Sequence, residues 1–84
     1  MKIRENLKFN KIGNEGIIFE ENSGNFFLLN EVAVKIIEEI LNQENPDIES
    51  IFLKIREEYD VDDEELKFDI ECFIREICEY KFIV

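Results

Sequence analysis

The chain has 84 residues, of which 45% are hydrophobic and 37% are charged. This length predicts one domain over residues 1–84, with enough apolar side chains for a core and too many for a disordered chain. Acidic residues outnumber basic ones 21 to 10, which gives a formal net charge of −11. Such a balance argues against nucleic acid and against an anionic membrane surface as partners.

Histidine is absent, which removes the usual general base and the commonest metal ligand. Cys72 and Cys78 are too few for a disulfide framework or a zinc site, and on one helix they would face different sides. We therefore expect unbonded thiols, no metal and no cofactor. No apolar run approaches about 18 residues, and residues 1–6 lack the apolar stretch of a signal peptide. These features favour a cytoplasmic protein.

Up to about Leu29 the sequence favours strands and turns. The three strand-like runs are Leu7–Asn10, Ile17–Phe19 and Phe26–Leu29, and turn signals lie at Asn14–Gly16 and Asn22–Asn25. Short β-branched and aromatic runs separated by such turns are typical of an antiparallel meander. A sheet of three short strands needs cover on its apolar face.

After Leu29 the apolar residues recur at helical spacing. The three amphipathic stretches run over 32–41, 48–59 and 66–80, followed by an apolar tail at 82–84. Expected N-caps are Asn30 for the first helix, Asn45 before Pro46 for the second, and Asp62 with Glu65 as a capping box for the third. The order predicts an α+β fold, winged-helix-like, with a three-stranded antiparallel sheet followed by three helices.

Catalytic and carrier chemistry is hard to place on this chain. Neither Ser23 nor Ser50 has a base at recognisable spacing, so we expect no enzyme. The acidic run 60–65 lacks the glycine of a calcium-binding loop and is better explained as a helix start. Glu49-Ser50-Ile51 resembles the Asp-Ser-Leu of acyl carrier proteins, but it lies inside a short helix that follows three strands.

Two binding modes remain for this fold. The second and third helices could form a helix-turn-helix, but acids dominate residues 57–71, where Lys67 is the only base, and phosphate would be repelled. An extended peptide could instead pair with the edge strand 26–29, beside the third helix, and place side chains in pockets. Alternation puts Phe27 and Leu29 on one face of that strand and the residues between them on the other.

Three segments resemble the PqqD family. They are Asn25–Ile37, with a Leu-Asn-Glu segment before an apolar helix; Ile55–Val61, a helix ending in a Tyr-x-Val turn; and Asp69–Ile77, an Asp-Ile-x-x-Phe-Ile-x-x-Ile helix. Together they extend the resemblance over residues 7–84. The family often has a glycine before its final apolar pair, where this chain has Tyr80-Lys81-Phe82, and an acidic-Gly pair after its first helix, where this chain has Asn-Gln-Glu-Asn at 42–45.

The resemblance implies a non-catalytic recognition element that binds the leader of a ribosomally made precursor peptide as an added strand. It further implies delivery to a tailoring enzyme, such as a radical SAM protein or a leader peptidase and cyclase. By position, the peptide-binding residues would be Asn25, Phe26, Phe27 and Leu28 on the third strand, with some of Lys67, Asp69, Ile70, Phe73, Ile74 and Ile77 on the third helix.

Several points stay open at this level. Asp69 and Glu76 flank one side of the apolar stripe of the third helix, and Lys67, Ile74 and Cys78 flank the other; either side could face the peptide. Asp69 could instead hydrogen-bond backbone near the sheet. Phe68 and Cys72 lie roughly opposite the core, and Phe68 is either a partner anchor or a scattered exposed side chain. The rival functions are a winged-helix regulator and an adaptor that docks an enzyme without binding a leader.

Overall fold

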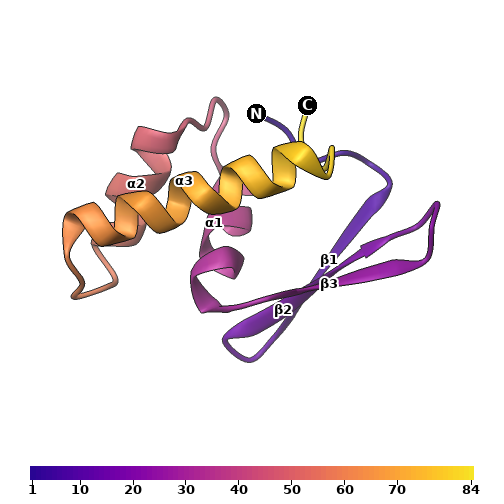
Figure 1. Ribbon diagram of the computed structural model, residues 1–84, viewed down its shortest axis with the longest axis horizontal. Helices are drawn as coiled ribbons and strands as arrows, with labels where there is room; N and C mark the ends of the chain where they lie inside the picture. Colours follow the sequence, from indigo (N-terminus) through magenta and orange to yellow (C-terminus); the bar gives the residue numbers. More distant parts are fainter.

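The computed structural model describes residues 1–84 and contains three strands followed by three helices (Figure 1). The elements are β1 (Leu7–Ile12), β2 (Glu15–Glu20), β3 (Asn25–Leu29), α1 (Glu31–Asn42), α2 (Ile48–Arg56) and α3 (Asp63–Glu79). The strands form one antiparallel sheet in the order β1-β2-β3, so β3 is an edge strand. The predicted α+β order is confirmed.

The first hairpin turns earlier than the sequence predicted. β1 and β2 pair from Leu7 with Glu20 to Ile12 with Glu15, so the loop is residues 13–14 and not 14–16. Gly13 has a φ of +62°, a conformation that suits a tight hairpin and that glycine adopts without steric cost. The predicted turn at 14–16 was wrong because Gly16 lies inside β2, where it is needed for packing and not for a turn.

Gly16 lets α1 approach the sheet closely. A Cβ atom at this position would lie 3.0 Å from Cγ2 of Val34 on α1, 3.0 Å from the backbone oxygen of Asn10 and 3.2 Å from the Phe9 ring. Two of these neighbours are a strand backbone and a fully packed helix side chain, which cannot move aside freely. Glycine is therefore required by packing at this site.

We expect Gly16→Ala to destabilise the fold by about 1–3 kcal/mol, because the added methyl overpacks the junction between sheet and helix. Urea unfolding followed by circular dichroism measures the change. Glu15→Ala, at the neighbouring exposed position, serves as the control and should stay within about 0.5 kcal/mol of the parent. Equal stability of Gly16→Ala and the parent would contradict the packing argument.

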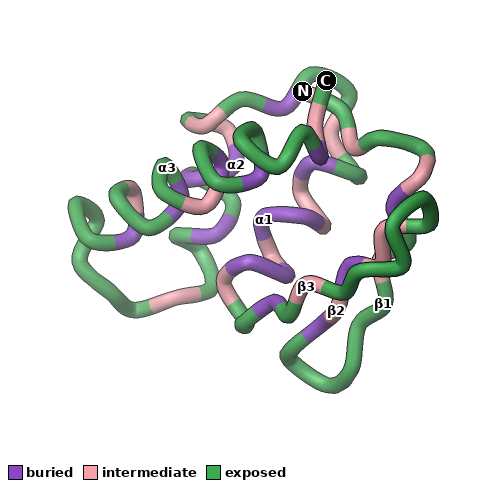
Figure 2. The backbone as a smooth tube through the Cα atoms, turned by 45° about the vertical axis from the view of Figure 1, so that its right-hand side comes forward, coloured by how far each residue is buried: buried purple, intermediate pink, exposed green.

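The core lies between one face of the sheet and the three helices, and α1 is at its centre. Figure 2 shows the tube of α1 buried over much of its length, whereas α3 is buried along one side only. α1 packs against β2, β3, α2 and α3. The buried residues of α1 are Ala33, Val34, Ile36, Ile37 and Ile40, and those of α3 are Leu66, Ile70, Ile74 and Ile77. None of the helices combines the length and the apolar character needed to cross a membrane.

Each of the three helices begins directly after an N-cap residue whose side chain accepts a backbone hydrogen bond. Asn30 caps α1 as predicted, with its Oδ1 accepting from the Ala33 N–H at 2.9 Å. The prediction of Asn45 as the cap of α2 was wrong: Asp47 caps it, forming a reciprocal capping box with Ser50. The reason is chemical, because Ser50 can return a hydrogen bond to Asp47, whereas Ile48, three residues after Asn45, cannot. Asp62 caps α3 as expected, but the Glu65 side chain returns no hydrogen bond, so the predicted capping box forms only in half.

The two ends of the chain pair with each other, an arrangement that sequence patterns did not indicate. Ile3 and Ile83 form an antiparallel bridge, and the Arg4 N–H donates to the Phe82 carbonyl at 2.9 Å. Figure 1 shows both termini at the same end of the molecule. This pairing fixes the C-terminal tail and places Phe82 in the core.

A Schellman motif turns the chain from α3 into this tail. The Lys81 N–H donates to the Cys78 carbonyl at 3.0 Å, and the Phe82 N–H donates to the Ile77 carbonyl at 2.9 Å. Lys81 has a φ of 61°, which places it in the left-handed region that glycine usually occupies at this point of the motif. Lys81 lies in the segment Tyr80–Phe82, where the PqqD family often has a glycine. In this chain a lysine therefore adopts the conformation that favours glycine.

We expect Lys81→Gly to stabilise the protein by about 0.5–1 kcal/mol, because it removes the Cβ penalty of the left-handed conformation at some cost in unfolded-chain entropy. Thermal unfolding should shift upward by about 2–8 °C. Lys81→Ala keeps the Cβ and should show no such gain. A gain in both variants would assign the effect to the lost charge instead of the backbone.

Candidate functional site

A groove runs between the free edge of β3 and α3, and it consists of three adjoining hollows. The central hollow has a volume of about 220 Å³, and its walls include Phe27, Phe73, Ile77 and Tyr80. The α1-side hollow, about 370 Å³, lies toward the start of α1. The terminal hollow, about 340 Å³, lies toward the paired chain ends. Neighbouring hollows share wall residues, so they form one continuous groove along β3.

Aromatic side chains shape the central hollow. The ring centroids of Phe27 and Phe82 are 4.7 Å apart in an edge-to-face arrangement, and those of Phe27 and Tyr80 are 5.2 Å apart. Such contacts hold the rings in place before any ligand arrives. The hollow therefore offers an apolar or aromatic side chain a wall of rings that already pack on one another.

β3 presents an unpaired edge to this groove. It pairs with β2 alone, so the main-chain groups on its other side have no strand partner. Leu28 is 87% exposed and forms part of the walls of both the central and the α1-side hollows. Phe26 is 64% exposed and its ring lies 5.0 Å from that of Phe19. The edge is accessible to an extended chain.

The structure brings most of the predicted site residues together. Those that line the central or α1-side hollow are Phe26, Phe27, Leu28, Asp69, Phe73 and Ile77. Asn25 lines the terminal hollow.

The other three predicted residues lie outside the groove walls. Ile70 and Ile74 are buried in the core. The Lys67 amino group lies 3.3 Å from a Glu49 carboxylate oxygen and over the Phe52 ring, so it faces α2. Residues advance by about 100° along a helix, so Asp69, two residues after Lys67, lies on the opposite flank of α3. Because the flank of Lys67 packs on α2, the flank of Asp69 faces the groove.

Several groove residues were not among the predicted peptide-binding residues. Glu76 lies two turns after Asp69 and lines the same hollow; its helical spacing was a usable signal. Cys72 also lines this hollow, although helical arithmetic placed it opposite the core. Tyr80 and Phe82 reach the groove because the chain reverses after α3, which no local pattern indicated. Phe68 is exposed and lies outside the walls.

The charges along the groove are unevenly distributed. Asp69 and Glu76 line the α1-side hollow, and neither takes part in an ion pair or a side-chain hydrogen bond within the chain. The alternative in which Asp69 bonds backbone near the sheet is therefore not observed. Arg4 and Lys81 line the terminal hollow and also have no acidic partner in the chain.

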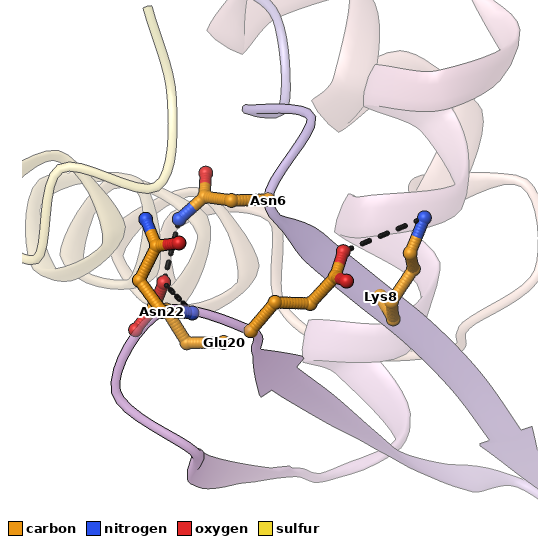
Figure 3. Close-up of polar contacts among 5 residues, drawn as sticks. Asn6, Lys8, Glu20 and Asn22 are labelled. Carbon is orange, nitrogen blue, oxygen red and sulfur yellow. Dashed lines mark hydrogen bonds and ion pairs between the residues drawn. The ribbon is translucent and has the colours of Figure 1, made fainter.

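The turn between β2 and β3, at the terminal hollow, is organised by Glu20. Its carboxylate accepts hydrogen bonds from the Ser23 N–H at 2.6 Å, the Asn22 N–H at 3.0 Å and the Asn6 side chain at 2.6 Å. Figure 3 shows the Asn6 and Asn22 contacts. Hydrogen bonds from Ser23 contribute most to lowering the pKa of Glu20 from 4.5 to about 2, with those from Asn22 and Asn6 adding to the effect against some desolvation.

We expect the Glu20 carboxyl group to titrate near pH 2, well below the ordinary pKa of 4.5, in a carbon-detected NMR titration. Because the folded-state pKa is depressed, the stabilisation from Glu20 is complete above its unfolded pKa of about 4.5 and is lost as the pH falls toward 2. Glu20→Gln should therefore lower the urea midpoint at pH 7 and have little effect near pH 2. A Glu20 midpoint near 4.5 would contradict this network.

The fold and the groove define a small α+β module with an open strand edge beside an apolar helix face. The family model described as Coenzyme PQQ synthesis protein D (PqqD) matches residues 15–83. The chain therefore belongs to the PqqD family. A search of the curated proteins finds no match.

Two solved structures are similar over nearly the whole chain. TbiB1 in complex with the TbiA(beta) leader peptide has 25% sequence identity and a TM-score of 0.84, covering 99% of this chain and 94% of that one. Lasso peptide synthetase B1 complexed with the leader peptide has 17% identity and a TM-score of 0.81, covering 99% and 95%. At 17% identity, the similarity to lasso peptide synthetase B1 shows a shared fold and nothing further.

Proposed function

We propose that this protein is a non-catalytic module that binds the leader of a ribosomally synthesised precursor peptide. The leader adds as a strand to the edge of β3, in the groove between β3 and α3, and the module delivers it to a modifying enzyme. The observation that carries this proposal is the unpaired edge of β3 facing an aromatic hollow across the groove. Strand addition uses such an edge for main-chain hydrogen bonds and adjacent pockets for alternate side chains.

The comparisons support this assignment in two ways. Membership of the PqqD family agrees with a role beside a biosynthetic enzyme. TbiB1, which shares the fold and a quarter of its residues with this chain, has been solved with a leader peptide. The unpaired edge of β3 and the apolar hollow beside it give the present chain the contacts to bind a similar peptide.

The modifying partner in this proposal is a tailoring enzyme such as a radical SAM protein or a leader peptidase and cyclase. The module itself contributes binding and no chemistry, because the one thiol in the groove wall, that of Cys72, has no histidine, lysine or arginine in its hollow to activate it. Precursor peptides are made by ribosomes, so we place this binding in the cytoplasm. Residues 1–84 act in it as one binding unit.

Leader binding can be tested with any short precursor peptide that the neighbouring genes encode. We expect Leu28→Asp to weaken binding by about tenfold or more, because it puts a charge into the shared wall of two hollows. Leu28 is so exposed that its replacement should leave the fold intact, as circular dichroism would verify. Phe68→Asp is the matched control, since Phe68 is 64% exposed and outside the groove. Fluorescence anisotropy gives both affinities.

NMR titrations and N-methylated peptides distinguish leader binding from the two alternatives, an adaptor that only docks an enzyme and a DNA-binding regulator. The leader should shift amide signals of residues 25–29 and 66–78, and N-methylation of alternate leader residues should abolish binding because it blocks the ladder to β3. Shifts confined to other regions would overturn the groove assignment. An adaptor would bind the enzyme and ignore the leader, whereas a DNA-binding regulator would give a gel shift at low salt.

A further inference from the structure

We propose that the charges at the two ends of the groove select a leader segment with a fixed charge order: a basic residue, then an apolar anchor, then an acidic residue, each two positions apart. This inference rests on the proposed leader-binding function and specifies its ligand. The three side chains would occupy the α1-side hollow, the central hollow and the terminal hollow in turn. Antiparallel pairing with β3 fixes the direction in which the leader runs.

The α1-side hollow offers negative charge to a ligand. The carboxylates of Asp69 and Glu76 lie seven residues apart on α3, on one side of the helix, and line this hollow together. No lysine or arginine lines this hollow, and neither carboxylate takes part in any of the five ion pairs of the chain. The α1 N-terminus at this end is already capped by Asn30. A lysine or arginine side chain is the complementary ligand.

The terminal hollow offers positive charge. Arg4 and Lys81 line it and have no acidic partner in the chain. The one carboxylate in this hollow, that of Glu20, already accepts three hydrogen bonds, two from the backbone of its own turn and one from the Asn6 side chain. An aspartate or glutamate side chain is therefore favoured here, even though the chain as a whole carries a net charge of −11.

The spacing follows from strand geometry. β3 is five residues long, a length of about 17 Å, over which an added strand directs every second side chain to the same face. Three side chains of an added strand therefore face the groove. The central one meets a wall that includes Phe73, Ile77 and Tyr80 and is apolar except for Glu76, where a bulky aliphatic or aromatic residue fits.

The direction follows from the antiparallel rule. β3 runs from the terminal hollow toward the α1-side hollow, since Asn25 lines the first and Leu28 lines the second. Antiparallel pairing is slightly more stable than parallel pairing, and the other strands of this sheet are all antiparallel. The N-terminal part of the leader segment then lies at Asp69 and Glu76, so its basic residue precedes the anchor.

Synthetic peptides of identical composition test this order. The probes are acetylated and amidated peptides that differ only in sequence around a phenylalanine: Lys-Thr-Phe-Thr-Glu in one, and Glu-Thr-Phe-Thr-Lys in the other. Both have the same net charge, so the overall acidity of the protein affects them equally. We expect the reversed peptide to bind about tenfold more weakly at low ionic strength, as two attractive charge contacts become repulsive.

Matched protein variants locate the effect. Asp69→Asn/Glu76→Gln should reduce the preference between the two peptides to about threefold or less, because only the terminal hollow still discriminates. Glu64→Gln/Glu71→Gln removes the same charge from α3 outside the groove hollows and should keep the full preference. Circular dichroism verifies that each variant is folded.

The outcomes distinguish the two proposals. If both peptides bind equally and both shift amide signals of residues 25–29, the charge-order inference is overturned while leader binding stands. A preference for the reversed peptide also overturns it. If neither peptide nor the neighbouring precursor shifts those signals, the proposed function fails, and this inference fails with it.

Discussion

The burial of α1 is the contact on which the rest of this structure depends. α1 touches β2, β3, α2 and α3, and its close approach to the sheet is permitted by the missing side chain at Gly16. Its isoleucines at 36 and 37 are completely buried, and burial of such side chains contributes roughly 1.5–3 kcal/mol each. Because α3 packs on α1 and α2, the edge of β3 faces α3 across a groove.

As a result, one side of α3 packs in the core and another side lines the groove. One side supplies the buried isoleucines at 70, 74 and 77, and Lys67 is drawn toward α2 by Glu49 and the Phe52 ring. The other side, with Asp69, Glu76 and the half-buried Phe73, remains for a ligand. The same packing that stabilises the helix bundle thereby decides which charges line the groove.

The pairing of the chain ends completes the groove at its far end. Lys81 takes a left-handed conformation, the chain reverses, and Phe82 enters the core beside Phe27. Arg4 is brought to the same place by its hydrogen bond to the Phe82 carbonyl. Residues from opposite ends of the sequence thus share one wall, which explains why the third hollow could not be anticipated from the order of motifs.

Local signals in the sequence determined the element order and two of the three N-caps, because periodicity and capping chemistry act over a few residues. The peptide groove between β3 and α3 was implied by the resemblance to the PqqD family. Only the tertiary structure decided that Gly16 is a packing residue, that the flank of Asp69 faces the groove, and that Arg4, Tyr80 and Phe82 line it. A helix pattern specifies which residues share a side, but the partner that each side meets depends on contacts between distant parts of the chain.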